Sequence, residues 1–253
     1  MDLSSIKAVL FDLDGTIYLG NQLIEGANET VEFFRKAGKK IFFATNNSTL
    51  RREQIFNKLI KIGVKCSIDE VVNSGYLAAL FLKQRRFKDV YVFGSEGLKA
   101  DLIEQGIPLN ETSQAKNLLI GYDPHATYED ITNAVEVALH AQAIIACNKE
   151  RTYPGQNGRI MPGCGAMTAP IEWCANRVCD FIIGKPNTIM IETLCHSLHI
   201  EPSECLMVGD TFESDIIMAN IAGSESILIS QSAYNGVNSV SDIQAIPALF
   251  KTN

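Results

Sequence analysis

The chain has 253 residues and a formal net charge of −7, and this length allows one large domain or two smaller ones. The acidic balance and the lack of a long Lys/Arg run argue against a nucleic-acid-binding protein. No apolar stretch approaches twenty residues and no basic-then-apolar leader opens the chain. We therefore expect no membrane association and a cytoplasmic location.

The seven cysteines form no C-x-x-C pair and have irregular spacing. An odd number in a chain this long favours reduced, mostly buried thiols over a disulfide framework or a zinc site. His196 and His199 lie three residues apart on a predicted helix. Without a third ligand we interpret them as ordinary surface histidines.

An apolar run at residues 6–10 predicts a buried strand, and Phe11-Asp12-Leu13-Asp14-Gly15-Thr16 follows it. Side chains alternate along a strand, so Asp12 and Asp14 point the same way if the chain stays extended. Two like charges in a partly dehydrated cleft repel each other, which favours a compensating divalent metal ion. The alternative is an Asp-Gly turn capped by a second aspartate.

In the first third, helical and strand patterns alternate after a short predicted hairpin or flap at residues 17–24. We predict a helix at 27–36, a strand at 39–45, a helix at 51–62, a strand at 71–73 and a helix at 74–84. This alternation is typical of a doubly wound, Rossmann-like parallel sheet, so the fold class is α/β.

Residues 85–88 interrupt the apolar pattern and predict a boundary, after which the alternation starts again. The expected strands lie at 90–93, 118–120, 143–147, 181–183, 205–208 and 226–229, and the helices between them at 97–105, 128–141 and through Trp173. We interpret Trp173 as a core residue of this middle region. The Gly/Pro-rich stretch 148–165 is predicted to be a long loop, and such loops are usually functional or disordered.

Further polar residues stand where predicted strands end. Thr45 closes the second strand, and its hydroxyl and the amides after it could hold an anion at a helix N-terminus. Lys185 follows one apolar strand, and Asp210 ends another with Asp215 five residues later. Open α/β sheets bind ligands at the carboxyl ends of their strands. Carboxylates for a hard cation, with Lys and Thr for an oxyanion, match phosphate plus Mg²⁺.

Two classes of protein use such a set. Receiver domains of signalling systems share the chemistry, but they are about half this length and their acceptor aspartate comes later in the chain. The second class is the haloacid dehalogenase superfamily. Asp12-Leu13-Asp14-Gly15-Thr16, Thr45-Asn46-Asn47, Gly184-Lys185-Pro186 and Gly209-Asp210 with Asp215 resemble its four motifs in their usual order.

This resemblance implies a Rossmann-like catalytic core at residues 1–84 and 181–253, with an inserted α/β cap at 85–180. The long insert looks like a type II cap. Asn148 and the stretch Pro162-Gly163-Cys164-Gly165-Ala166 are similar to the cap signature of the NagD-like, 4-nitrophenylphosphatase-like branch.

The resemblance also implies roles for the residues of the core. Asp12 would be the nucleophile that forms an aspartyl-phosphate, and Asp14 the general acid and then the general base. Mg²⁺ would bind the Asp12 carboxylate, the Asp14 carbonyl and Asp210, and Asp215 would be a direct ligand or an outer-sphere group. The oxygens of the phosphoryl group would be held by Thr45, Asn46, Asn47 and Lys185.

The cap would set specificity, and Asn148 and Tyr153 are the predicted contacts of the substrate. The branch often has Asn-Pro-Asp at this loop, whereas this chain has Asn148-Lys149-Glu150. Solvated loop side chains are an equally good reading of this region. Cys164 lies between two glycines and is interpreted as a small residue at the start of a helix.

We therefore expect a Mg²⁺-dependent phosphatase that hydrolyses a small phosphomonoester, such as a sugar phosphate or a nucleotide. The alternatives are a phosphotransferase or mutase on the same scaffold, and a sensor that only binds a phosphate ligand. The intact Asp14 weighs against the sensor, because binding needs no general acid. The predicted partner is a small molecule, and the apolar helices of the cap predict a homodimer through the cap.

Overall fold

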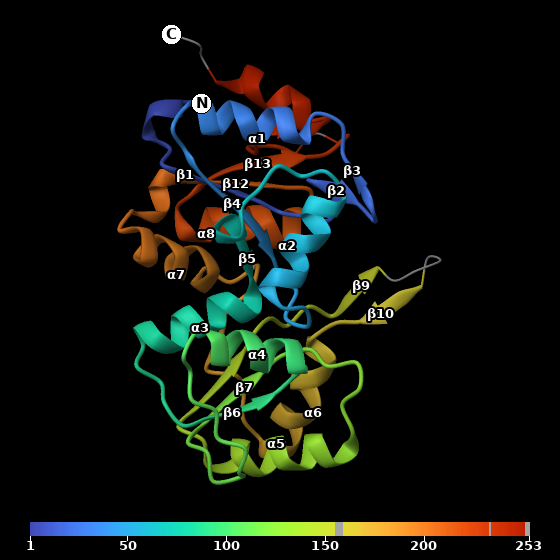
Figure 1. Cartoon of the computed structure of the whole chain (residues 1–253), viewed down its shortest axis with the longest axis vertical. Coiled ribbons are helices and arrows are strands. Elements are labelled where there is room, and N and C mark those ends of the chain that lie inside the picture. Colours follow the sequence, from blue (N-terminus) through green and yellow to red (C-terminus); the bar gives the residue numbers. More distant parts are fainter. Residues whose placement is uncertain (155–158, 233, 251–253) are drawn as a thin grey trace. The chain divides into compact units, whose positions relative to one another are not determined.

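The computed structural model describes residues 1–154, 159–232 and 234–250. The chain forms two compact units. The first unit comprises Met1–Thr45, Glu53–Val72 and Lys185–Asn253, and the second comprises Asn46–Arg52 and Asn73–Gly184. In Figure 1 the first unit contains the blue and the orange-to-red parts of the chain, and the second contains most of the green and yellow parts.

The first unit is built on a six-stranded sheet in the order β14-β13-β12-β1-β4-β5 (Figure 1). The strands are β1 (Ala8–Phe11), β4 (Lys40–Thr45), β5 (Val71–Asn73), β12 (Cys205–Gly209), β13 (Glu225–Ile229) and β14 (Ser239–Val240). The central strand β1 runs parallel to both of its neighbours, β4 and β12. This arrangement confirms the predicted parallel α/β core.

Alternate residues of β1 pack on opposite faces of this sheet. Val9 and Phe11 belong to a buried apolar cluster with α1 (Ala27–Lys36), α2 (Arg52–Lys61) and a 3-10 helix at Ile243–Leu249. On the other face lie α7 (Ile189–Leu198) and α8 (Ile217–Ala222). Because both faces are covered, every residue of β1 is buried and the strand reads as a continuous apolar run.

The predicted short hairpin after β1 is confirmed. Strand β2 (Tyr18–Leu19) pairs antiparallel with β3 (Gln22–Leu23), with Tyr18 opposite Leu23. Gly20 lies in the turn with a φ of +63°, a left-handed conformation that glycine adopts at low cost.

The second unit contains a parallel four-stranded sheet in the order β11-β8-β7-β6. These strands are β6 (Val90–Phe93), β7 (Asn117–Ile120), β8 (Ala143–Ala146) and β11 (Phe181–Ile182). Its helices are α3 (Ser74–Gln84), α4 (Glu96–Glu104), α5 (Tyr128–His140) and α6 (Gly165–Ala175), shown in Figure 1. One buried cluster joins Leu118, Ile120 and Ile144 to the apolar sides of α5 and α6.

Three sequence-based expectations in this unit are wrong. The stretch 148–165 is not all loop, because β9 (Thr152–Pro154) and β10 (Ile160–Pro162) pair as antiparallel strands. Each strand is too short for its sequence to show an alternating pattern of apolar and polar residues. Trp173 is 87% exposed and is therefore no core residue. The strand before Lys185 belongs to the second sheet, whereas we expected it in the core sheet.

The predicted domain limits, 1–84 with 181–253 and 85–180, remain a prediction. The compact units group α3 and residues 46–52 with the second sheet. In the described part of the chain, no helix combines the length and the apolar character needed to cross a membrane.

Candidate active site

The acidic pair lies where β1 ends. The Asp12 amide donates to the Val208 carbonyl at 2.8 Å, so the chain keeps its pairing with β12 up to this residue. Leu13 is buried, whereas Asp14 is exposed and the Asp12 side chain is 14% exposed. The two carboxylates are thus separated by a side chain that anchors the turn in the core.

A tight turn follows, centred on the Leu13 carbonyl. This oxygen accepts hydrogen bonds from the amides of Thr16, Ile17 and Tyr18 at 3.3, 2.9 and 3.1 Å. Gly15 has a φ of +87°, and a Cβ added there would lie 2.1 Å from Oδ2 of Asp210. Glycine is therefore required at this position for two reasons, the left-handed backbone and the close approach of a carboxylate.

Asp210 and Asp215 come from the end of β12 and from the π-helical turn at Phe212–Ile216. Asp215 is fully buried, and its Oδ2 accepts from the Thr211 amide at 3.2 Å. A Cβ at Gly209 would lie 2.3 Å from that same oxygen, so this glycine leaves the room that Asp215 occupies. Carboxylate oxygens of Asp12, Asp210 and Asp215 lie within 4.8 Å of one another.

Lys185 supplies the positive charge of this cluster. Its side chain is 4% exposed, and its ammonium group donates to Asp12 through a short contact and to Oδ1 of Asp215 at 2.7 Å. The residue returns the chain to the first unit directly after Gly184. The structure thus brings Asp12, Lys185, Asp210 and Asp215 together in the first unit, as the sequence predicts.

Burial controls the electrostatics of the cluster. It raises the pKa of Asp12 to about 7, an effect that Lys185 opposes and that the charges of Asp215 and Asp210 increase. Burial and the charge of Asp215 also raise the pKa of Asp210. Burial alone would lower the pKa of Lys185, but Asp12 and Asp215 outweigh it and the pKa is raised. Asp12 and Asp210 are therefore stabilised in their charged forms by a further nearby cation.

This donor set fits a divalent metal ion. Three carboxylates and one ammonium carry a formal charge of −3 + 1 = −2. The three aspartates would coordinate a metal ion through carboxylate oxygens, which are the ligand atoms that Mg²⁺ and Ca²⁺ prefer. The residues that could hold the ion are Asp12, Asp210 and Asp215, and the role of Asp14 as a ligand stays a prediction.

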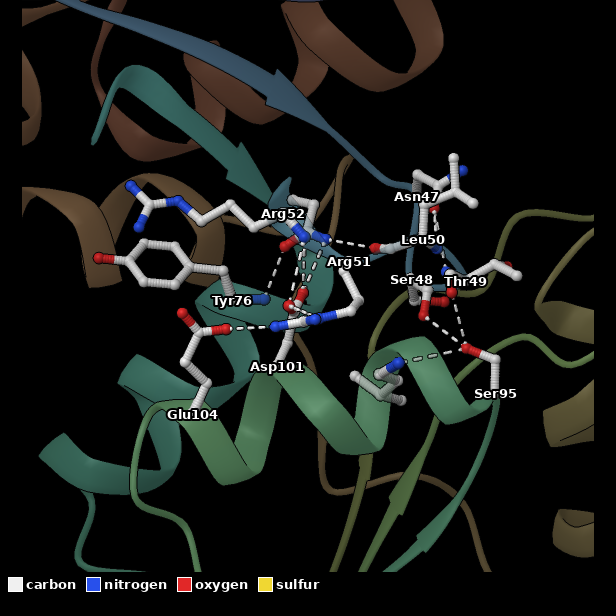
Figure 2. A network of polar contacts seen from close by, with 12 residues as sticks. Asn47, Ser48, Thr49, Leu50, Arg51, Arg52, Tyr76, Ser95, Asp101 and Glu104 are labelled. Carbon is white, nitrogen blue, oxygen red and sulfur yellow. Dashed lines mark hydrogen bonds and ion pairs between the residues drawn. The ribbon is translucent and has the colours of Figure 1, made fainter. Parts of the chain in front are cut away.

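Thr45 is the last residue of β4 and lies in the first unit. No helix of the described chain begins directly after Thr45, and the binding of an anion by its hydroxyl and the amides that follow stays a prediction. Helix α2 begins only at Arg52, and the Arg52 amide already donates to both carboxylate oxygens of Asp101, at 3.2 and 3.0 Å (Figure 2). Asp101 thus supplies the negative charge at the N-terminus of α2.

The segment 46–52, which follows Thr45, is bound at the carboxyl ends of the second sheet. The Tyr122 amide donates to Oγ of Ser48 at 3.0 Å. Oγ of Ser95 donates to the Thr49 carbonyl at 2.9 Å (Figure 2). A Cβ on Gly97 would lie 2.3 Å from the Thr49 carbonyl oxygen. Small residues at the ends of these strands therefore make room for a piece of the chain.

Asn46 and Asn148 lie together in this second unit. The Asn148 side chain donates to the Asn46 carbonyl at 2.7 Å, and the Asn46 side chain donates to Oε1 of Glu150 at 2.7 Å. The Asn47 side chain accepts from the amides of Thr49 and Leu50 at 3.0 and 2.9 Å, and so it shapes the turn that follows (Figure 2). Asn148 and Glu150 therefore hold the loop that carries Asn46.

Tyr153 lies on β9 and is 37% exposed. Its ring meets that of Tyr122 edge-on with centroids 5.8 Å apart, and the two hydroxyls are 3.4 Å apart. The hydrogen bond to Tyr153 and burial raise the pKa of Tyr122 to about 12. The structure thus pairs a predicted substrate contact with a tyrosine that the sequence did not single out.

Sequence reasoning also missed Asp101. This residue is buried in α4 and gave no signal, because the Arg52 amide that donates to it lies about fifty residues earlier in the chain.

A parallel sheet with carboxylates at the carboxyl ends of its strands, and with a buried lysine bonded to these carboxylates, is the arrangement of α/β enzymes that act on phosphate groups. Residues 9–108 match the family described as haloacid dehalogenase-like hydrolase, and residues 182–248 match the family described as HAD-hydrolase-like. The chain belongs to the haloacid dehalogenase-like hydrolases.

Relatives agree with this assignment. The chain is 36% identical to the sugar-phosphatase AraL of Bacillus subtilis, over 89% of this chain and 83% of the relative. It is 30% identical to an acid sugar phosphatase of Staphylococcus aureus, over 96% of this chain and 92% of the relative. Both matches extend over nearly the whole chain.

Solved structures agree as well. A 4-nitrophenylphosphatase of Thermotoga maritima superposes with a TM-score of 0.87 at 26% identity, covering 97% of this chain and 98% of that one. A structure from Bacillus subtilis, described as a putative p-nitrophenyl phosphatase, has the same TM-score at 28% identity, with 96% of each chain covered. The chain is thus a phosphatase of this family, in the NagD and p-nitrophenylphosphatase-like branch with a type II cap.

Proposed function

We propose that this protein is a Mg²⁺-dependent phosphatase that hydrolyses small phosphomonoesters, with sugar phosphates as the substrate class. The observation that carries the mechanism is the cluster of Asp12, Asp210 and Asp215 around Lys185, with exposed Asp14 two residues beyond Asp12. The names of the two sugar-phosphatase relatives support the substrate class.

In the first half-reaction, a carboxylate oxygen of Asp12 attacks phosphorus and the bond to the leaving oxygen breaks. The product is an aspartyl-phosphate, and a proton from Asp14 neutralises the leaving alkoxide. In the second half-reaction, Asp14 takes a proton from water, and the water oxygen attacks phosphorus. Inorganic phosphate leaves and the Asp12 carboxylate is restored.

Mg²⁺ held by Asp12 and Asp210, with the Asp14 carbonyl, would supply positive charge that offsets the repulsion between nucleophile and phosphate. Lys185 provides a second positive charge at Asp12, and its bond to Asp215 holds it there. Asp215 is fully buried and already bonded to Thr211 and Lys185, which supports an orienting role for it.

Thr45, Asn46 and Asn47 complete the proposed phosphate site, and Asn148 and Tyr153 the proposed leaving-group site. For Asn148 we favour an indirect role, because its side chain holds the backbone of Asn46. The Asn47 side chain likewise serves the turn at Thr49 and Leu50, so we propose that its contribution to substrate binding passes through the backbone.

We further propose a cytoplasmic location, which is supported by seven cysteines that form no disulfide. A homodimer through the cap stays a prediction. The phosphotransferase or mutase and the phosphate sensor are the alternatives that an assay must exclude.

The test is phosphate release from a panel of phosphomonoesters by the purified protein, with Mg²⁺ and after removal of metal by a chelator. We expect turnover of sugar phosphates that is lost on chelation and restored by Mg²⁺. Binding of phosphate esters without turnover would instead indicate the sensor. Faster transfer to an added sugar or nucleoside than to water would indicate the transferase.

A further inference from the structure

The backbone carbonyl of Asn46 accepts two hydrogen bonds from buried side chains of the second unit. Oγ of Ser74 donates to it at 2.7 Å, and Nδ2 of Asn148 donates to it at 2.7 Å as well. Ser74 is fully buried, and Asn148 and Asn46 are 3% and 6% exposed. A carbonyl oxygen has two lone pairs, which these two donors match. The orientation of this peptide group is therefore set inside the protein.

Ser74 is itself held by the start of α3. It is the first residue of this helix, and Asn73 before it is the N-cap, whose Oδ1 accepts from the Tyr76 amide at 2.7 Å. Nδ2 of Asn73 donates to the Leu50 carbonyl at 2.9 Å. Two consecutive side chains thus hold carbonyls at both ends of the turn 46–50, and a capped helix fixes the position of both.

The bonds to the Asn46 carbonyl also set the direction of the Asn47 amide, because the two groups belong to one peptide unit. The peptide bond between these residues is trans. In a planar trans peptide the carbonyl and the following N–H point in opposite directions. The Asn47 amide therefore points away from Ser74 and Asn148, and it cannot turn unless the carbonyl leaves both donors.

The side chains of both asparagines also have partners within the second unit. Nδ2 of Asn46 donates to Oε1 of Glu150 at 2.7 Å. Oδ1 of Asn47 accepts from the amides of Thr49 and Leu50 at 3.0 and 2.9 Å (Figure 2). These bonds favour the peptide amide as the group that this segment presents to a phosphoryl oxygen.

We propose that Ser74 is a positioning residue for the phosphate site: with Asn148, it fixes the plane of the peptide between Asn46 and Asn47 and directs the Asn47 amide toward a phosphoryl oxygen. The inference rests on the proposed function, in which this segment helps to hold the phosphoryl group. Ser74 acts through the peptide, because its own hydroxyl is buried and bonded to the carbonyl. A donor that is already oriented needs no reorganisation when charge develops on the phosphoryl oxygens.

The test compares Ser74→Ala with Ser224→Ala, a matched control. Ser224 is 8% exposed, and its Oγ donates to the Pro202 carbonyl at 2.6 Å. Each variant therefore removes one buried hydroxyl that donates to a backbone carbonyl. Alanine is well tolerated in helices, and Asn73 still caps α3, so we expect Ser74→Ala to fold. Circular dichroism and thermal unfolding compare the stability of the two variants.

We expect Ser74→Ala to lower kcat/KM about five- to tenfold, the size of one lost hydrogen bond. The factor should be the same for a hexose phosphate and for 4-nitrophenyl phosphate, because both present the same phosphoryl group. Orthovanadate mimics five-coordinate phosphorus, and its inhibition constant should rise by a similar factor. Ser224→Ala should change each quantity less than about twofold, although it loses the same kind of bond.

Inhibition by orthovanadate separates positioning from a merely structural role. A smaller fraction of folded protein lowers kcat but leaves this inhibition constant unchanged. Asn148→Ala removes the other donor to the same carbonyl and should raise the constant too, which tests the inference if Ser74→Ala is unstable.

An unchanged inhibition constant in Ser74→Ala, or equal losses of kcat/KM in Ser74→Ala and Ser224→Ala, would overturn the inference. A wild-type protein that releases phosphate from neither substrate would instead overturn the proposed function, so the two failures are distinguishable.

Discussion

The two units have the same architecture but carry different residues at the ends of their strands. Each has a parallel sheet with packed helices, and in each the functional groups gather where strands end. In the first unit these ends carry Asp12 and Asp210, with Lys185 bonded between Asp12 and Asp215. In the second unit they carry mostly neutral residues, such as Ser95, Tyr122 and Asn148, which hold the segment 46–52 together with the carboxylate of Glu150.

The difference follows from charge. Clustered carboxylates repel each other and bind a cation, so they form a site for a ligand. Neutral hydroxyls and amides satisfy the backbone of a loop, so the same edge of the second sheet binds a piece of the chain. We propose that the edge of the first sheet carries the chemistry and that the edge of the second sheet supports Asn46. Each prediction below tests one side of this comparison.

The largest effect is expected from removing the proposed nucleophile, Asp12. Asp12→Asn keeps the size of the side chain but has no anionic oxygen to attack phosphorus, so turnover should fall at least about a thousandfold. Phosphate release and the far-ultraviolet circular dichroism spectrum are the measurements. Full Mg²⁺-dependent hydrolysis by a folded variant would refute the proposed mechanism.

A single methyl group at Gly15 should disrupt the carboxylate cluster of the first unit. In Gly15→Ala the new Cβ would lie 2.1 Å from Oδ2 of Asp210, at a φ of +87°. We expect kcat/KM to fall about a hundredfold, because a displacement of about 1 Å costs roughly that much. The affinity for Mg²⁺, measured by titration calorimetry, should fall too.

Gly20→Ala is the matched control for this change. Gly20 also has a positive φ, but an added Cβ meets no heavy atom of the described residues within 4 Å. It should cost about 1 kcal/mol of stability at most and leave kcat/KM nearly unchanged. Equal losses of activity in the two variants would show that backbone strain, and not the approach of Asp210, controls the site.

The support that the second unit gives to the segment 46–52 is tested by Gly97→Ala on α4. The added Cβ would lie 2.3 Å from the Thr49 carbonyl oxygen, so the segment 46–52 should shift. Because this segment carries Asn46, we expect kcat/KM to fall about tenfold although no charged group of the site is altered. Glu96→Ala, an 89% exposed neighbour on the same helix, is the control. An unchanged kcat/KM in Gly97→Ala would show that the second unit does not support the phosphate site.

The smallest effect concerns the ion pair that holds the cap loop. Burial raises the pKa of Glu172, but the hydrogen bond from Lys149 and the Cys179 amide outweigh burial, and the pKa is lowered. A carboxylate with a depressed pKa stabilises the fold above its ordinary value and loses this contribution as the pH falls through the folded pKa.

Wild type should therefore lose more stability than Glu172→Gln when the pH drops from 6 to about 3, by roughly 1 kcal/mol, since Lys149 is partly exposed and the pair is screened. Urea unfolding at several pH values measures this difference. Parallel losses in the two proteins would show that Glu172 does not carry the pH dependence.

Local pattern was sufficient for most of the fold. The helices Ala27–Lys36 and Ser74–Gln84 and the strand Val90–Phe93 occur within the predicted limits, because each buries an apolar face or run that its own residues define. The prediction that Trp173 is a core residue was wrong for the complementary reason. A large apolar side chain does not by itself reveal whether another element covers it.

The identity of Asp12, Asp14, Lys185 and Asp210 as a candidate site followed from the sequence alone, since charged residues at strand ends form a pattern that neighbours in the chain disclose. Only the tertiary structure revealed that β11 belongs to the second sheet and that Asp101 occupies the helix N-terminus at Arg52. Those relations depend on contacts between elements that sequence periodicity does not encode. Periodicity records which face of an element is buried, and folding decides which other element covers that face.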